Sequence, residues 1–248
     1  MSSALSKHRV RARAPSGRPG HRFADRVQSR QPVRTGEPGT VAVVNTGLCN
    51  LDSMRRALSN LGVGTVLANT PADLSGCKRI ILPGVGNFGA GMAALNESGF
   101  TPALQAAAAA QTPILGVCLG MQLLADRGYE GGPINGLGLV GGEVRMLEPG
   151  GSEEKLPHVG WNEVIHDGGS PLLHGVSSGA DFYFVHSYHF APSSDAVAVA
   201  RTPYCGGFVS VIQDNYLFGA QFHPEKSQKA GAAILRNFIN FTAGQNEC

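Results

Sequence analysis

The chain has 248 residues, of which 42% are hydrophobic and 15% charged, with 34 glycines and 15 prolines. This size and apolar content suit one α/β domain or two small domains, and they exclude disorder over most of the chain. No run of about 18 uninterrupted apolar residues occurs, which argues against a membrane-spanning helix, and an aromatic content of 7% argues against stacking on nucleic-acid bases.

The net charge of +2 is unevenly distributed. Residues 1–38 carry nine basic and two acidic residues, a net charge of +7, so the remainder is acidic with a net charge of −5. Residues 1–39 are rich in Arg, Ser, Pro and Gly, and they are predicted to form a disordered basic extension. We favour a solvated tail with no role in the chemistry. An organelle transit peptide, or an over-extended start whose true first residue lies nearer Val33 or Val41, are the alternatives.

Cysteine usage indicates a reducing compartment, which we take to be the cytoplasm. The number of cysteines is odd and they form no CxxC pair: Cys49, Cys77, Cys118, Cys205 and Cys248. Neither a disulfide framework nor a zinc site is therefore predicted.

The first half of the chain alternates strand and helix patterns. A β-branched run at residues 40–44 is typical of a buried strand, and apolar residues at helical spacing then predict a helix over 51–61. Asn50 or Asp52 would cap this helix and Gly62 would end it. The next predicted elements are strands over 63–67 and 79–82, a helix over 89–111 interrupted near Gly99, a strand over 113–117 and a helix over 119–126. Such alternation predicts a parallel sheet covered by helices.

The second half is predicted to consist of short strands between turns, followed by one helix. The strand-like runs lie at 139–146, 161–165, 181–186, 196–201, 208–212 and 217–222, and the closing helix at 228–241. We expect one domain over residues 40–245, an α/β fold with a mixed, mostly parallel central sheet flanked by helices. The later strands would add an antiparallel part.

The strongest local signal is a cysteine between two glycines, in the segment Gly116-Val117-Cys118-Leu119-Gly120. An apolar strand runs into Cys118 and a helix follows, which makes the segment the cysteine counterpart of the G-x-S-x-G nucleophile elbow. A sharp turn of this kind places the nucleophile at strained backbone angles, and larger side chains two residues away would collide with neighbouring backbone. The positive end of the following helix would favour the reactive thiolate. An inert buried cysteine in a glycine-rich turn is the alternative.

A thiol nucleophile needs a general base held by a third group, and His223 and Glu225 fit these roles. His223 follows a predicted strand, so it would lie at the carboxyl end of the sheet, where sites collect. Because Pro224 favours extended geometry at His223, residues 223 and 225 would face the same way with Cα atoms about 6.5–7 Å apart. Three other histidines near strand ends are candidate pocket residues: His158, His186 and His189.

A glycine-rich bend, Leu82-Pro83-Gly84-Val85-Gly86, follows another predicted buried strand. Its free N–H groups could hold a developing oxyanion together with the N–H of Leu119. The bend lacks the spacing of a phosphate-binding loop, and an ordinary tight turn is the alternative.

Taken together, Cys118, His223 and Glu225 resemble the Cys-His-Glu triad of the class I glutamine amidotransferases. Segments spread over roughly residues 40–242 are similar to the glutaminase subunits of imidazole glycerol phosphate synthases, namely 45–51, 82–88, 116–124, 156–162 (LPHVGWN), 182–188 (FYFVHSY) and 221–227. LPHVGWN and FYFVHSY carry the specificity, because the triad motif occurs across many amidotransferases. The sequence departs from the family at Asn45, where aspartate is more frequent, and in its basic extension.

The resemblance implies that Cys118 attacks the side-chain amide of L-glutamine, that His223 transfers the protons and that Glu225 holds His223. A glutamyl thioester would form and be hydrolysed by water, with no metal or organic cofactor. The resemblance also implies an oxyanion site at Gly84, Val85 and Leu119, in which the Gly84–Val85 peptide reorients before it donates. Contacts to glutamine would come from Gly86, Gln122, Ser187 and Tyr188.

The family passes ammonia to a synthase partner, a (β/α)₈ barrel, so the resemblance implies a heterodimer. Composition and charge predict neither nucleic acid nor a membrane as a partner. In the barrel, ammonia gives imidazole glycerol phosphate and an aminoimidazole carboxamide ribotide, a step of histidine biosynthesis. Residues expected at the interface are Asn50, Trp161, Tyr183 and Lys226. A core aromatic is the alternative for Trp161, and a solvated surface charge for Lys226.

Three rival functions share parts of this pattern. A glutaminase subunit that feeds pyridoxal phosphate or chorismate chemistry would have the same triad, but the LPHVGWN segment argues against it. A hydrolase of γ-glutamyl peptides could use the same scaffold. An interaction module with a vestigial triad is disfavoured because all three side chains and both oxyanion elements occur in order.

Overall fold

The computed structural model describes residues 41–242, which lie within one compact unit. The predicted disordered extension over residues 1–39 lies outside the described residues. None of the helices between residues 41 and 242 has the length and hydrophobicity of a membrane-spanning helix.

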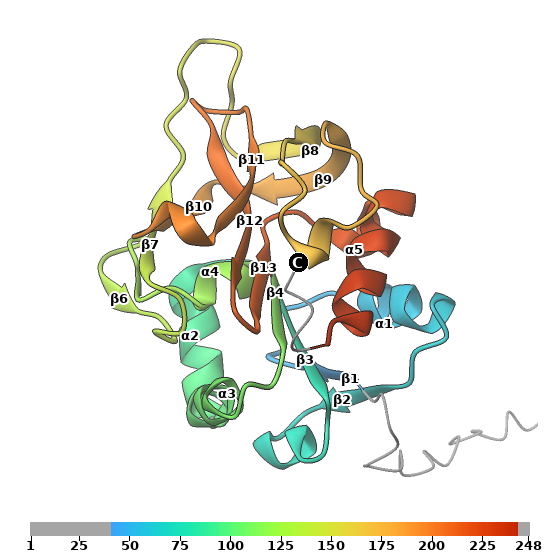
Figure 1. Cartoon of the computed structure of the whole chain (residues 1–248). Coiled ribbons are helices and arrows are strands. Elements are labelled where there is room, and N and C mark those ends of the chain that lie inside the picture. The colour runs from blue at the N-terminus through green and yellow to red at the C-terminus, as the bar shows by residue number, and fades with distance from the viewer. Residues whose placement is uncertain (1–40, 243–248) are drawn as a thin grey trace, which may run out of the picture. The chain divides into compact units, whose positions relative to one another are not determined.

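A seven-stranded sheet forms the centre of this unit, in the order β11-β12-β13-β4-β3-β1-β2 (Figure 1). Neighbouring strands from β13 to β2 are parallel, whereas β11–β12 and β12–β13 are antiparallel. The predicted mixed, mostly parallel sheet with a later antiparallel part is therefore confirmed. The strands are β1 (Val41–Val44), β2 (Thr65–Ala68), β3 (Arg79–Gly84), β4 (Ile114–Cys118), β11 (Ala198–Thr202), β12 (Phe208–Asp214) and β13 (Leu217–Ala220).

Helices cover both faces of this sheet, because successive side chains of a buried strand point to opposite faces. In β1, Val41 and Val43 pack into the cluster that contains Leu58 and Leu235, from the helices α1 (Leu51–Asn60) and α5 (Gln228–Asn240). Ala42 and Val44 pack into the opposite cluster with residues of α2 (Phe88–Glu97), α3 (Phe100–Ala109) and α4 (Leu119–Leu123). Figure 1 shows α1 and α5 on one side and α2 and α3 on the other.

Helix boundaries follow the predicted signals in most places. Asn50 caps α1 by accepting a hydrogen bond from the Ser53 N–H at 3.3 Å, and Gly99 separates α2 from α3 in the left-handed conformation. The helix predicted over 119–126 is too long. It ends at Leu123 because the Asp126 N–H bonds to the Gly142 carbonyl instead of continuing the helix.

Two smaller sheets stand apart from the central one, with the orders β10-β7-β5-β6 and β8-β9. The predicted strands near 139–146, 161–165 and 181–186 are therefore present in the smaller sheets. Ile165, just after β8, adds one antiparallel bridge to Arg201 of the central sheet. Strands β5, β6 and β10 were not predicted from the sequence. The strands are β5 (Arg127–Gly128), β6 (Ile134–Asn135), β7 (Gly142–Met146), β8 (His158–Val164), β9 (Ala180–His186) and β10 (Tyr188–Pro192).

Arg79, on β3 of the central sheet, forms hydrogen bonds to the C-terminal end of α5. Its guanidinium donates to the carbonyl oxygens of Phe238 and Phe241, at the end of the helix where carbonyls lack the regular helical donors. The Phe238 carbonyl also accepts the Phe241 N–H at 3.3 Å. We expect Arg79→Ala to lower the free energy of unfolding by about 1–2 kcal/mol, because partly buried carbonyls lose charged donors. Urea denaturation would measure this loss. Arg236→Ala is the control, since Arg236 lies exposed on the same helix; an equal loss in both variants would contradict the assigned role.

Candidate active site

Cys118 ends β4, and Leu119 begins α4 directly after it. Its backbone has φ 54° and ψ −111°, a strained conformation for a non-glycine residue. A Cβ atom at Gly116 would lie 2.5 Å from the Gly120 carbonyl oxygen, and one at Gly120 would overlap the Leu82 carbonyl. The predicted strain and the predicted need for both glycines are confirmed. However, α4 has only 5 residues, so the dipole expected behind the thiol is weaker than that of a long helix.

Cys118 is 5% exposed, and its sulfur lies between the Val185 carbonyl and the buried side chain of Gln221. Its S–H is directed at the Val185 carbonyl oxygen, 3.9 Å away, and Gln221 Nε2 donates to the sulfur at 3.8 Å. The thiol is thus held by protein groups in its resting position.

His223 and Glu225 form a buried pair next to this turn. His223 Nδ1 lies 2.8 Å from Glu225 Oε1, and their side chains are 3% and 4% exposed. Strand β13 ends at Ala220, earlier than the predicted residue 222, because the chain turns to bring the His223 N–H onto the Tyr183 carbonyl. The backbone at His223 is extended, as predicted, and Ser227 Oγ donates to its carbonyl at 2.7 Å.

The pKa of His223 is set by opposing effects. Burial alone would lower it, but the Cys118 sulfur and the Glu225 carboxylate raise the pKa of His223 to about 9. Among the described residues, His223 Nε2 forms no hydrogen bond, although the sulfur is near enough to affect the ring. Catalytic hydrogen bonds are often loose before substrate binds, so the geometry suits a base that closes on the thiol in the complex.

The other candidate histidines have the opposite electrostatics. Burial lowers the pKa of His158 to about 4 and that of His186 to about 3, and it also lowers the pKa of His189. Of these three, only His186 lines the pocket described below. Of these four histidines, only His223 is paired with a buried carboxylate, and this pairing favours it as the base.

The expected oxyanion residues lie beside the thiol. Parallel pairing of β3 with β4 places Gly84 opposite Cys118, and both Val85 and Leu119 line the pocket. The Val85 N–H, however, donates to the Leu48 carbonyl at 2.8 Å. This donor is therefore occupied in the structure, in line with the expectation that the Gly84–Val85 peptide must reorient.

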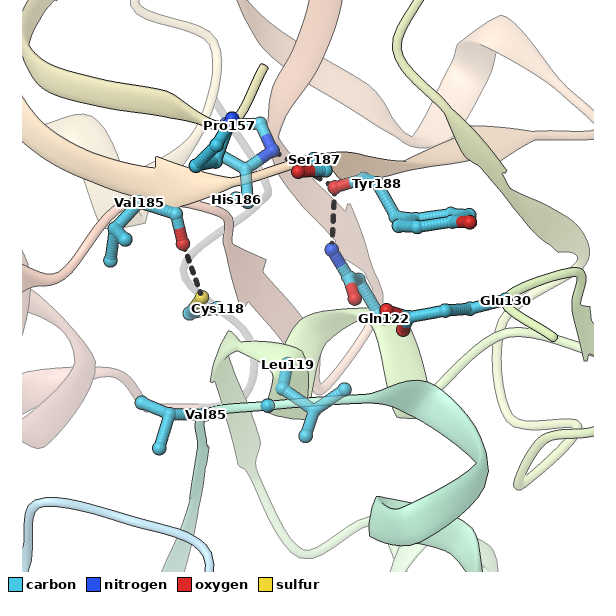
Figure 2. Close-up of a pocket in the computed structure, with 11 residues that line it drawn as sticks. Val85, Cys118, Leu119, Gln122, Glu130, Pro157, Val185, His186, Ser187 and Tyr188 are labelled. Carbon is cyan, nitrogen blue, oxygen red and sulfur yellow. Dashed lines mark hydrogen bonds between the residues drawn. The ribbon is translucent and has the colours of Figure 1, made fainter.

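A pocket of about 250 Å³ opens over the Cys118 sulfur (Figure 2). Its wall includes all four residues expected to contact glutamine: Gly86, Gln122, Ser187 and Tyr188. Gln122 Nε2 donates to the Tyr188 carbonyl at 2.7 Å, which ties α4 to β10. The pocket is small and is lined by both polar and apolar residues, so it suits a single amino acid.

Glu130, which was not predicted as a site residue, lies on the pocket wall and points toward Gln122 (Figure 2). Its Oε2 accepts the Phe88 N–H at the start of α2 at 2.7 Å. A carboxylate on this wall could pair with the ammonium group of an amino acid. No local pattern marks Glu130, because its position depends on a contact 42 residues away in the chain.

Three of the four expected interface residues form one exposed cluster. Trp161 on β8 is paired in register with Tyr183 on β9, with ring centroids 6.0 Å apart, and Lys226 Nζ lies 5.5 Å from the centre of the Tyr183 ring. Trp161 is 48% exposed, so it is not a core aromatic. Asn50 is also exposed, but its side chain caps α1.

Comparisons with known proteins agree with this geometry. The Glutamine amidotransferase class-I family matches residues 42–241. The imidazole glycerol phosphate synthase subunit HisH of Moorella thermoacetica is 41% identical over 198 residues, which are 80% of this chain and 93% of that protein. HisH of Xylella fastidiosa is 44% identical over 203 residues, 82% of this chain and 98% of that protein.

A solved structure of PurLQS from Thermotoga maritima resembles the chain in fold, with a TM-score of 0.64 at 19% identity over 81% of this chain and 97% of that one. The extent of the family match and the identity to HisH proteins together decide the family. The chain belongs to the class I glutamine amidotransferases and, within them, to the HisH subunits of imidazole glycerol phosphate synthase.

Proposed function

We propose that the chain is the glutaminase subunit of an imidazole glycerol phosphate synthase and acts in histidine biosynthesis. The observation that carries this proposal is the identity of more than 40% to HisH proteins over nearly their whole length. A pocket with a cysteine in its wall and a buried His–Glu pair beside it supports hydrolysis of L-glutamine to glutamate and ammonia.

In the proposed mechanism, Cys118 is the nucleophile. Its thiol proton moves to His223 Nε2, and the sulfur attacks the carbonyl carbon of the glutamine side chain. Glu225 accepts the Nδ1–H of His223 and stabilises the imidazolium that forms. The protonated ring then gives its proton to the departing ammonia, which leaves a glutamyl thioester. Water, activated by His223, hydrolyses the thioester and releases glutamate.

Glutamine would be oriented by the opposite end of the pocket. Glu130 and Oε1 of Gln122 can accept hydrogen bonds from its ammonium group, while the segment Ser187–Tyr188 and Gly86 offer backbone groups to its carboxylate. This orientation directs the side-chain amide of glutamine toward Cys118.

The oxyanion site is incomplete in the resting arrangement. Leu119 supplies an N–H beside the nucleophile, but the Val85 N–H is bonded to Leu48. A rotation of the Gly84–Val85 peptide would release this donor, and stabilisation of the oxyanion by one such donor is worth roughly 10²–10³ in rate. We infer that this rotation accompanies assembly with the synthase subunit.

The HisH relatives are subunits of a larger enzyme, so this chain acts with a synthase subunit. We propose that this partner is a (β/α)₈ barrel and that the exposed cluster of Trp161, Tyr183 and Lys226 faces it. Ammonia passed to the barrel would react with a phosphorylated ribulosyl intermediate. The cytoplasmic location expected from the cysteine usage stays a prediction.

The proposal is tested by mixing the chain with a HisF-type synthase subunit and its nucleotide ligand, then measuring glutamate release. We expect release to rise at least tenfold over that of the chain alone. Stimulation only by a synthase of another pathway would instead favour a different amidotransferase. Efficient hydrolysis of γ-glutamyl peptides without a partner would favour the peptide hydrolase.

A further inference from the structure

The side-chain amide of Gln221 touches the sulfur of Cys118. Gln221 is fully buried, and its Nε2 lies 3.8 Å from the sulfur in hydrogen-bonding geometry. The glutaminase mechanism outlined above does not use this side chain. Since buried amides satisfy their donors and acceptors, the remaining partners of Gln221 determine which end of the amide faces the sulfur.

The orientation of the Gln221 amide is fixed by Gln122. Gln122 Nε2 lies 2.7 Å from the Tyr188 carbonyl oxygen and 3.0 Å from Gln221 Oε1. A backbone carbonyl can only accept, so the NH₂ group of Gln122 must face Tyr188. Its second hydrogen then faces Gln221, which must present its oxygen there. The NH₂ group of Gln221 is left to face the sulfur.

The Tyr188 carbonyl is itself held by a pair of buried histidines. His186 Nδ1 lies 2.9 Å from this carbonyl, so the ring must donate from Nδ1 and accept at Nε2. His158 Nδ1 lies 3.2 Å from that Nε2, and Asn162 Nδ2 lies 3.2 Å from His158 Nε2. Both rings are buried and neutral, so each ring donates one hydrogen bond and accepts one. The hydrogen bonds therefore run in one direction, from Asn162 through His158 and His186 to the Tyr188 carbonyl.

We propose that Gln221 is a catalytic residue that donates a hydrogen bond to the Cys118 sulfur and stabilises its thiolate, and that Gln122 and the Tyr188 carbonyl hold this donor in place. The proposal rests on Cys118 being the glutaminase nucleophile. In the resting site the thiol hydrogen is directed at the Val185 carbonyl, which would repel an anion. When the proton moves from the sulfur to His223 Nε2, the sulfur becomes an acceptor, and the Gln221 N–H is already directed at it.

Two variants of Gln221 test this role in the complex with the synthase subunit. Gln221→Glu keeps an acceptor toward Gln122 but places an oxygen against the sulfur, and Gln221→Met keeps the volume without a donor. The readout is the rate of alkylation of Cys118 by iodoacetamide as a function of pH, followed at residue 118 by peptide mass mapping. For Gln221→Glu we expect the pH midpoint of Cys118 alkylation to rise by about one pH unit. The alkylation rate at pH 7 would then be about tenfold lower, because less of the sulfur is thiolate. For Gln221→Met we expect a smaller rise, and for both variants a lower kcat/KM for glutamine.

Gln213→Glu is the matched control. Gln213 is a partly buried amide on β12 whose Oε1 accepts from Ser170 Oγ, a contact that glutamate retains. It should leave both the profile and the activity unchanged. Wild-type midpoints in folded Gln221→Glu and Gln221→Met proteins would overturn the proposal. If Gln221→Glu fails to fold, the profile of Gln221→Met decides. Glutamine hydrolysis by a Cys118→Ala variant would instead overturn the glutaminase mechanism, so the two failures are distinguishable.

Discussion

Replacing Cys118 by alanine is expected to lower glutamine hydrolysis by at least about 10³-fold, because among the described residues that line the pocket only Cys118 supplies a thiol, and it does so at the strained turn. Synthesis from added ammonium salts should survive in the complex, since free ammonia bypasses the glutaminase site. Glutamate release and product formation by the synthase subunit, each measured with glutamine and with ammonium chloride, would separate the two activities.

The control for this variant is Cys77→Ala. Cys77 is a free cysteine that does not line the pocket, so its removal should change neither activity. Retention of glutaminase activity by Cys118→Ala would show that the nucleophile is elsewhere. Loss of ammonium-dependent synthesis as well would show that the substitution damages assembly with the partner rather than the chemistry.

The parts of the fold that could be predicted are those fixed by local patterns. The β-branched run of β1 and the glycines around Cys118 each act over a few residues, and the structure contains the strand and the strained turn that they predict. The short strands β5 and β6 carry no such pattern, because two residues each cannot show an alternation.

The parts of the site that could not be predicted depend on contacts between distant segments. Glu130 reaches the pocket through its bond to Phe88, and Gln221 acquires its orientation from Gln122, 99 residues away. The occupied state of the Val85 N–H likewise depends on Leu48. Sequence patterns can thus mark a nucleophile and its base, whereas the polarity of the groups around the sulfur emerges only once the sheet and its loops are assembled.

Replacing Glu225 by glutamine is expected to lower kcat for glutamine hydrolysis by roughly 10²–10⁴-fold while the pocket stays intact. The carboxylate lies 2.8 Å from His223 Nδ1 and is 4% exposed, so its charge acts on the ring with little solvent screening. Without that charge, the imidazolium formed during attack loses its main stabilisation, and a flipped amide can impose the wrong tautomer. Because Glu225 is absent from the pocket wall, KM should change far less than kcat.

The same substitution should change how stability depends on pH. The pKa of His223 is raised to about 9 in the folded protein, above the value of about 6.5 for an unfolded histidine. A raised pKa contributes stability in full below about pH 6.5 and loses it as the pH rises through about 9. The difference in unfolding free energy between wild type and Glu225→Gln should therefore be largest near pH 6 and shrink toward pH 9.5. Urea denaturation at several pH values would measure it. A difference that does not vary with pH would mean that Glu225 acts on His223 through packing and hydrogen bonding alone, without the charge coupling on which the proposed proton transfer depends.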